Sequence, residues 1–261
     1  MTAYYNEIDP YAAQWLRNLI AASHIAPGDV DERSIVDVKP DDLKGYEQCH
    51  FFAGIGGWSY ALRLAGWSDD RAVWTGSCPC QPLSSAGKQK GHLDERHLWP
   101  AFYRLVEECG PAVVFGEQVA SPDGYRWVSA VRADMEGGGY ACGIADLPGF
   151  FAGALQQRQR LYWVACADSA GCDRFAKQNQ QSQAGIEASW RNNTDRRGSP
   201  FWAAARPMEG ADNTRRLLAP GIELLADGLS EGMGQRRSFG NAIIPQVAAE
   251  VIGAYLDLEA A

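Results

Sequence analysis

The most restrictive feature of the sequence is a short apolar run at 49–52 that leads straight into a glycine-rich turn at 53–57, Ala-Gly-Ile-Gly-Gly. Apolar residues at helical spacing follow as far as Gly66. A strand, a glycine turn and a helix in this order let the backbone approach a bound nucleotide at the carboxyl end of the strand. The same order also occurs in ordinary tight turns, so this motif alone leaves both interpretations open.

Strand and helix patterns alternate along most of the chain, which indicates an α/β fold around a parallel sheet. Asp9 and Pro10 suit the N-cap and first position of a helix. Apolar runs predict strands near 3–5, 49–52, 73–75, 112–115, 140–146 and 160–165. Helical spacing predicts helices near 10–22, 60–65, 98–108 and 125–136, and a last one from Pro245.

The composition fits one large folded unit with a small appendage. The chain has 261 residues, of which 46% are hydrophobic and 21% are charged, and this argues against wholesale disorder. No apolar run approaches the roughly 18 residues of a membrane helix. The N-terminus lacks the pattern of a secretory signal, so we expect a cytoplasmic protein without a membrane partner. Seven cysteines, an odd number, favour reduced thiols over a disulfide framework.

The charge is unevenly distributed. The net charge of −8 speaks against a nucleic-acid partner, but residues 156–240 contain more Lys and Arg than Asp and Glu. A mildly basic C-terminal third is therefore attached to an acidic body, although ordinary scatter explains this equally well. After Ala167 the sequence becomes polar and loses its periodicity. We expect a main domain at 1–167, a small variable segment at 168–235 and a returning segment with the last helix at 236–261.

A cysteine motif, Pro79-Cys80-Gln81-Pro82, follows the strand predicted near 73–75. A loop at a strand end gives a nucleophilic cysteine the access that it needs. Cys78 and Cys80 form half of a metal site at most, because no second Cys or His pair of suitable spacing follows. We therefore expect no metal.

Two further motifs carry charge at strand ends. Glu117 follows Cys80 by 37 residues, and consecutive strand ends of a parallel sheet open on one edge. Both side chains can then face one pocket, where a carboxylic acid protonates or hydrogen-bonds a ring nitrogen. The alternative is a helix cap or a surface acid. Arg158 and Arg160 alternate along a strand and so share a face that suits phosphate or carbonyl oxygens, unless they form a solvated edge.

Together these motifs resemble the DNA cytosine-5 methyltransferases, and in particular a small phage-like member. The family's Phe-x-Gly-x-Gly-Gly turn, Pro-Cys-Gln loop, Glu-Asn-Val strand end, Gln-x-Arg-x-Arg strand and late Gly-Asn segment correspond to 52–57, 79–81, 117–119, 156–160 and 240–241. The resemblance covers about 2–165 and 236–255 and leaves 168–235 unmatched. It implies a Rossmann-like doubly wound methyltransferase sheet, with 1–167 as the catalytic domain and 168–235 as the target-recognition segment.

Two departures from the family pattern need an explanation. Gln118 stands where the family usually has an Asn that is thought to brace the Pro-Cys-Gln loop, and a longer amide can still do so. Only 22 residues separate Gly57 from Cys80, where the family has two more strands. Residues 5–9 resemble the family's ribose-binding strand end, and residues 27–30 its adenine-side loop. We therefore predict a permuted chain, the alternative being an unrelated lead-in and a truncated sheet.

The resemblance implies transfer of a methyl group from S-adenosylmethionine to C5 of a flipped cytosine in double-stranded DNA by a monomer. It places Cys80, Glu117, Arg158 and Arg160 in catalysis. The cofactor-binding residues that it implies are Glu7, Ile8, Asp29, Val30, Phe52, Gly54, Ile55, Gly56, Gly57, Pro79 and Asn241. DNA contacts are expected from Gln81, Ser84, Ser85, Arg196, Arg197, Arg215 and Arg216. The alternatives are C5 methylation of RNA and a catalytically silent DNA-binding or decoy protein of the same fold.

Overall fold

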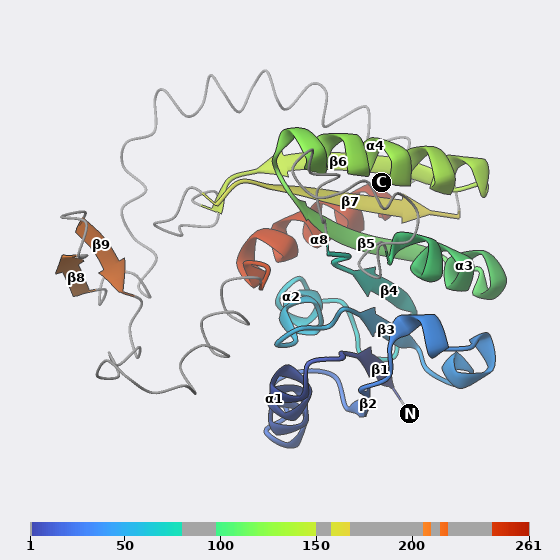
Figure 1. Cartoon of the computed structure of the whole chain (residues 1–261), viewed down its shortest axis with the longest axis horizontal. Helices are drawn as coiled ribbons and strands as arrows, with labels where there is room; N and C mark the ends of the chain where they lie inside the picture. The colour runs from blue at the N-terminus through green and yellow to red at the C-terminus, as the bar shows by residue number, and fades with distance from the viewer. Residues whose placement is uncertain are drawn as a thin grey trace, which may run out of the picture.

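A computed structural model of the chain describes residues 2–79, 98–149, 158–167 and 242–260, and the backbone of two further strands at 206–209 and 215–218. Seven strands form one sheet, namely β1 (Ala3–Asn6), β2 (Gly28–Asp31), β3 (Gln48–Phe51), β4 (Val73–Gly76), β5 (Val113–Val119), β6 (Ala141–Leu147) and β7 (Arg160–Cys166). Their order across the sheet is β2-β1-β3-β4-β5-β7-β6 (Figure 1). The other two strands, β8 (Arg206–Glu209) and β9 (Arg215–Leu218), pair with each other.

The sheet is mixed, which corrects the expectation of a purely parallel one. The strands from β2 to β5 pair parallel, whereas β7 pairs antiparallel with both β5 and β6. The sequence predicts no helix between the strands near 140–146 and 160–165. Parallel neighbours need a long crossover, usually a helix, so strands without one pair antiparallel.

The two N-terminal strands are full members of this sheet. In the register of β1 with β3, Ala3 lies opposite Gln48 and Asn6 lies opposite Phe51. The strand β2 pairs with the other edge of β1. The first thirty-odd residues therefore extend the sheet beyond β3, and the alternative of a truncated sheet with an unrelated lead-in is wrong.

Helices cover both faces of the sheet (Figure 1). They are α1 (Pro10–Ala21), α2 (Gly57–Leu64), α3 (Trp99–Cys109), α4 (Pro122–Gly137) and α8 (Pro245–Glu259), with short 3-10 helices η1 (Ile35–Asp37) and η2 (Pro40–Leu43). One apolar core joins α3 and α4 to one face, and others join α1, α2 and α8 to the opposite face. Alternation along the strands explains this division, since Trp74 lies in the first core and Val73 in the second.

Most helix boundaries follow from capping chemistry. Asp9 caps α1 by accepting hydrogen bonds from the N–H groups of Tyr11 and Ala12, as its place before Pro10 predicts. The helix α4 begins three residues before its predicted start, because Ser121 caps it and Pro122 takes its first position. None of the helices in the described ranges is long and apolar enough to span a membrane.

The cysteines depart in part from the expectation of reduced thiols. Cys49, Cys109 and Cys142 have free thiols. Cys166 at the end of β7 is disulfide-bonded, contrary to that expectation.

Candidate active site

Glu117 lies near the end of β5 and faces the guanidinium group of Arg160 at the start of β7. The Arg160 Nε lies 2.6 Å from Glu117 Oε1, and both side chains are largely shielded from solvent. This contact is an ion pair without straight hydrogen-bond geometry, so Oε1 has no hydrogen-bond partner among the described residues. The antiparallel register of β5 and β7 brings these two side chains together, because it places Glu117 opposite Tyr162, two residues from Arg160.

Burial sets the protonation of this carboxyl group. The pKa of Glu117 is raised to about 7, mainly by burial, although the charges of Arg160 and Arg158 oppose the shift. An acid with a pKa near neutrality exchanges a proton readily at physiological pH. Glu117 is therefore suited to hydrogen-bond or protonate a ring nitrogen, and the alternative of a helix cap or surface acid is wrong.

Arg158 precedes β7, whereas Arg160 is the first residue of that strand, and the two have different contacts. Arg158 donates a hydrogen bond from Nη2 to the carbonyl oxygen of Ala242 at 2.6 Å. It thereby connects the head of β7 to the segment that leads into α8. Burial lowers the pKa of Arg158, and the positive charge of Arg160 lowers it further. Arg160 makes an ion pair with Glu117, whereas the hydrogen bond of Arg158 holds the chain that returns to the sheet.

Gln118, the residue after Glu117, supports the start of the cysteine motif. Its Nε2 donates a hydrogen bond to the carbonyl oxygen of Cys78 at 3.1 Å, and the side chain is buried. Its own Oε1 accepts a hydrogen bond from the N–H of Val119. The longer amide therefore contacts the loop, as expected of the residue that replaces Asn. Cys80 itself lies outside the described residues, while Pro79 is described and exposed.

The glycine turn and Glu7 meet at the ends of β3 and β1. Glu7 Oε2 accepts a hydrogen bond from the N–H of Gly54 at 2.7 Å, and Oε1 accepts one from the N–H of Asp9 at 2.9 Å. Burial raises the pKa of Glu7, while these two hydrogen bonds oppose the rise. Each oxygen keeps a second lone pair for a ligand hydroxyl group. Gly54 itself has a φ of +56° and open space where a Cβ would stand.

The other two glycines of the turn serve packing, which the sequence analysis did not foresee. A Cβ on Gly57 would lie 2.8 Å from Cγ1 of Ile243, a residue of the returning segment. A Cβ on Gly56 would lie 3.3 Å from side-chain carbons of α1, and its φ is +81°. These positions admit neighbouring side chains to the turn, so the observed geometry favours Gly54 for a ligand contact.

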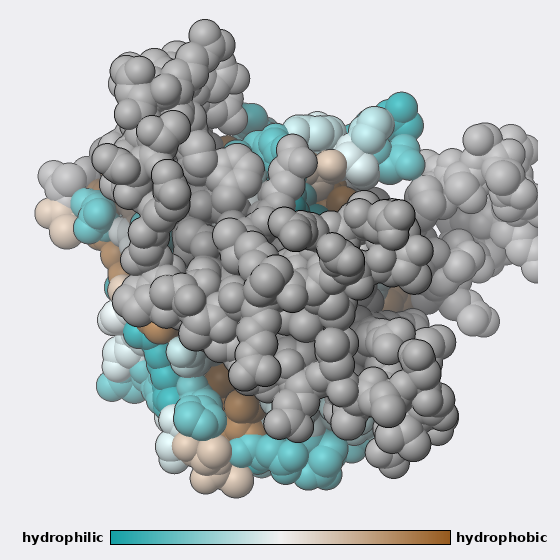
Figure 2. All heavy atoms as spheres, turned by 90° about the vertical axis from the view of Figure 1, so that its left-hand side faces the viewer, coloured by the Kyte–Doolittle hydropathy of each residue, from teal (hydrophilic) through white to brown (hydrophobic). Residues whose placement is uncertain are grey.

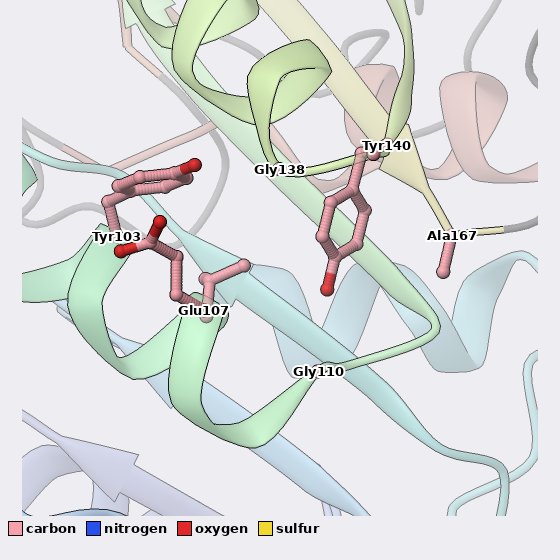
Figure 3. A pocket seen from close by; sticks show the side chains of 8 residues that line it. Tyr103, Glu107, Gly110, Gly138, Tyr140 and Ala167 are labelled. Atoms are coloured by element: carbon pink, nitrogen blue, oxygen red, sulfur yellow. The ribbon is translucent and has the colours of Figure 1, made fainter.

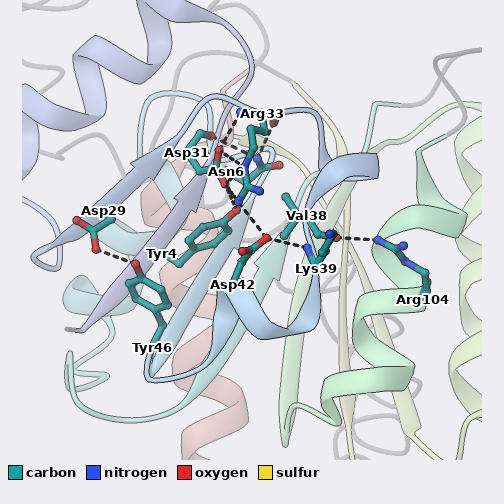
Figure 4. A network of polar contacts seen from close by, with 10 residues as sticks. All are labelled: Tyr4, Asn6, Asp29, Asp31, Arg33, Val38, Lys39, Asp42, Tyr46 and Arg104. Atoms are coloured by element: carbon teal, nitrogen blue, oxygen red, sulfur yellow. Dashed lines mark hydrogen bonds and ion pairs between the residues drawn. The ribbon is translucent and has the colours of Figure 1, made fainter.

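The end of β2 is organised differently from the expectation for Asp29 (Figure 4). Asp29 lies opposite Tyr4 and accepts a hydrogen bond from the hydroxyl of Tyr46 at 2.7 Å. Tyr46 precedes β3, so the structure does not bring this carboxylate to Glu7. Asp31 ends β2 opposite Asn6, and it accepts hydrogen bonds from Arg33 and from the hydroxyl of Tyr4 at 2.6 Å.

The remaining residues predicted for the site lie partly within and partly outside the described residues. Ile8 follows Glu7 and is 64% exposed. Phe52, between β3 and Gly54, has a φ of +52° and packs against Phe102. Outside the described residues lie Gln81, Ser84, Ser85, Arg196, Arg197 and Asn241. Arg215 and Arg216 belong to β9, of which the backbone alone is described.

A cavity among the described residues lies away from these side chains. It has a volume of about 360 Å³ and lies between the ends of α3 and α4, lined by Tyr103, Glu107, Tyr140 and Ala167 among others (Figure 3). These residues lie where β5 and β6 begin, and Glu117 lies where β5 ends. The cavity and the acid thus lie at opposite ends of strand β5. In the described ranges, no group of three or more His, Cys, Asp or Glu side chains could hold a metal ion.

The edge at which the parallel strands end lies on the left of Figure 1, where α1 and α2 follow β1 and β3. Figure 2 views the molecule from that side, and the described atoms visible there are mostly hydrophilic around a smaller hydrophobic area. Trp58 at the start of α2 donates a hydrogen bond to Ser77 Oγ at 2.9 Å on this edge. The sequence gives one signal of this contact, a tryptophan directly after the glycine turn.

Several known proteins are similar to this chain in sequence. A model of the family "C-5 cytosine-specific DNA methylase" matches residues 68–195. The type II methyltransferase M.HhaI of Haemophilus parahaemolyticus is 26% identical over 180 residues, which cover 54% of this chain and 55% of that protein. M.AluI of Cellulosimicrobium cellulans is 30% identical over 116 residues, which cover 40% of this chain and 22% of that protein. The chain thus spans about half the length of M.HhaI and a smaller part of M.AluI.

A similar fold exists among solved structures. A DNMT2 variant from Spodoptera frugiperda superposes with a TM-score of 0.55 at 13% identity, over 98% of this chain and 92% of that chain. The family match begins after the glycine turn and continues past 167, where the motif resemblance stops.

Proposed function

We propose that the chain is a C-5 cytosine-specific DNA methylase, since a model of that family matches residues 68–195, and that it methylates C5 of cytosine in double-stranded DNA, with S-adenosylmethionine as the methyl donor. The observation that carries the proposal is the buried pair of Glu117 and Arg160 beside the amide of Gln118, which holds the start of the Pro-Cys-Gln loop. An acid with a raised pKa next to a cysteine loop is the combination that attack on C6 requires.

Cys80 and Glu117 share the activation of the base. The thiolate of Cys80 forms a bond to C6, and the C5–C6 electron pair moves into the ring while Glu117 donates a hydrogen bond or proton at N3. S-adenosylmethionine supplies the electrophilic methyl group. C5, now enamine-like, would take that methyl group while its bond to sulfur breaks and S-adenosylhomocysteine leaves. Loss of the C5 proton to water restores the double bond and expels the Cys80 thiolate.

Arg160 holds Glu117 in place and can reach the base carbonyl. The positive charge of its guanidinium group stabilises the ionised carboxylate of Glu117. It therefore limits the rise in the pKa of Glu117 that burial causes. Arg158 has an indirect role, because its hydrogen bond to the carbonyl oxygen of Ala242 anchors the segment before α8. The returning segment carries Asn241, which the resemblance assigns to the cofactor.

The cofactor site that we propose lies between β1, β2 and the glycine turn. Glu7 fits the ribose hydroxyl groups, because its carboxylate is held by Gly54 and retains free lone pairs. Exposed Ile8 is available to an adenine ring. On the adenine side we assign the end of β2, where Asp31 is better placed than Asp29. The ribose and adenine strands then precede the glycine turn in a permuted chain.

Target recognition is assigned to 168–235, together with Gln81, Ser84 and Ser85 of the cysteine loop. This segment contains eight Lys and Arg side chains between Arg174 and Arg216. We expect its arginines to contact phosphates and base edges of a short target site. The intact set of Glu117, Arg160 and Cys80 argues against a catalytically silent protein.

Transfer of a labelled methyl group to duplex DNA tests the proposal, with an RNA of the same sequence beside it. Duplex DNA containing 5-fluorocytosine should trap the enzyme as a covalent adduct, because fluorine cannot leave C5 as the proton does. Peptide mapping should place the adduct on Cys80. Labelling of RNA alone, no transfer to either substrate, or an adduct on Cys78 would contradict the proposal.

A further inference from the structure

The buried indole of Trp58 is the feature of the edge that the proposed chemistry does not use. Trp58 is the second residue of α2, directly after the glycine turn, and is 4% exposed. Its ring packs against Phe115 of β5 and Tyr162 of β7, with centroids 6.1 and 6.2 Å apart. The ring is therefore fixed between the helix that follows the cofactor turn and the two strands that carry Glu117 and Arg160.

The polar end of this ring is directed at the cysteine loop. Trp58 Nε1 donates a hydrogen bond to Ser77 Oγ at 2.9 Å, and Ser77 is the first residue after β4. Its neighbour Cys78 accepts the hydrogen bond from Gln118. Two successive residues of the chain that leads to Cys80 are thus held from two sides, Ser77 by the Trp58 side chain of α2 and Cys78 by the Gln118 side chain of β5.

We propose that Trp58 and Ser77 form a positioning pair that links the cofactor turn to the cysteine loop, and this inference rests on the proposed function. Gly54 and Trp58 belong to one turn-and-helix unit, so a cofactor bound against the turn fixes the backbone position from which the Trp58 side chain extends. The indole in turn fixes the place at which the chain leaves β4, three residues before Cys80. Trp58 touches neither reactant in this proposal, so it is a positioning residue rather than a catalytic one.

The chain offers a matched control for this tryptophan. Trp67 is also buried, at 2% exposed, and also donates its indole N–H, in this case to the backbone carbonyl of Arg71 at 3.1 Å. Its ring also packs against Phe115. Trp67 follows α2, however, and its hydrogen bond stays within the segment between α2 and β4. Trp67→Phe therefore removes the same kind of hydrogen bond without touching the link.

The test compares Trp58→Phe, Ser77→Ala and their combination with Trp67→Phe in the full-length protein. The readout is the rate of covalent adduct formation on 5-fluorocytosine DNA at saturating S-adenosylmethionine, with cofactor affinity measured by calorimetry. Loss of one hydrogen bond should slow the adduct about three- to tenfold in each single variant. The double variant should be no slower than the slower single variant, and Ser77→Thr, which keeps the hydroxyl group, should recover the rate.

Cofactor affinity should change less than twofold in all these variants, and Trp67→Phe should keep the adduct rate of the wild type. The inference is overturned if Trp58→Phe is no slower than Trp67→Phe, or if the two single effects multiply in the double variant. An adduct that fails to form in the wild type contradicts the proposed function instead, so the two failures are distinguishable.

Discussion

The carboxylate of Glu7 accepts a hydrogen bond from the backbone N–H of Gly54 at 2.7 Å, although 47 residues separate the two in the chain. This contact ties the end of the first strand to the glycine turn at the end of the third. The two strands are adjacent and parallel, so their carboxyl ends open on one edge. A segment that precedes the turn in sequence therefore stands where a ligand held by the turn would meet it.

Replacement of Glu7 tests its role at this edge. Glu7→Ala should weaken binding of S-adenosylmethionine about 10- to 100-fold, because hydrogen bonds to a charged carboxylate contribute about 1.5–3 kcal/mol. Calorimetric titration measures the change. Glu32→Ala is the matched control, since Glu32 is an exposed acid paired with Arg17 and should leave the affinity unchanged. Equal affinities for Glu7→Ala and the control would remove Glu7 from the cofactor site.

The raised pKa of Glu117 predicts a pH dependence of stability. The folded protein binds this proton up to a pH of about 7, whereas the unfolded chain releases it near the ordinary value of 4.5. The contribution of Glu117 is fully present below pH 4.5 and is lost as the pH rises through 7. The free energy of unfolding should therefore fall by up to roughly 3 kcal/mol more in the wild type than in Glu117→Gln between pH 4.5 and 8. Denaturant titrations measure it, and parallel curves would contradict the shift.

The amide of Gln118 predicts a combined loss of stability and activity. Gln118→Ala leaves the buried carbonyl of Cys78 without its donor, which costs about 1–3 kcal/mol in free energy of unfolding. Adduct formation at Cys80 should slow as well, because the loop loses one of its supports. Gln14→Ala is the control, since Gln14 makes an exposed hydrogen bond on α1. A variant that unfolds at a lower denaturant concentration yet keeps the full rate of adduct formation would show that the brace does not position Cys80.

The close approach of Gly57 and Ile243 predicts a coupled pair. Gly57→Ala places a methyl group 2.8 Å from Cγ1 of Ile243 and should destabilise the protein by about 1–3 kcal/mol. Ile243→Ala alone should also destabilise it, because it removes a buried side chain. The double variant should lose less stability than the sum of the two, since the smaller residue admits the methyl group. Strictly additive losses would mean that the two residues do not meet.

The arginines of the variable segment predict a salt-dependent affinity for DNA. Arg196 and Arg197 neutralised together should weaken binding on every sequence and flatten the dependence of log K on log salt by about two contacts. Fluorescence anisotropy of labelled duplexes at several salt concentrations measures this. An unchanged slope would mean that the main domain grips DNA without these side chains.

The sequence by itself determined which residue types stand at each strand end. Alternating apolar patterns placed β1, β3, β4, β5, β6 and β7, and the turn chemistry of Asp9 and Pro10 placed the start of α1. These are local signals, because capping and periodicity depend on neighbours a few residues away. The identity of Glu117 and its place at the end of a strand also followed from the sequence.

Only the tertiary structure decided what these residues meet. The antiparallel direction of β7 brings Arg160 to Glu117, and the pairing of β1 with β3 brings Glu7 to Gly54. The pKa of Glu117 is raised because the surrounding layers bury it, and no local pattern records that burial. Likewise, Gly57 serves Ile243, and Trp58 serves Ser77, through contacts between segments that are distant in the chain. Contacts of this kind arise from the packing of whole elements, so residue spacing alone does not specify them.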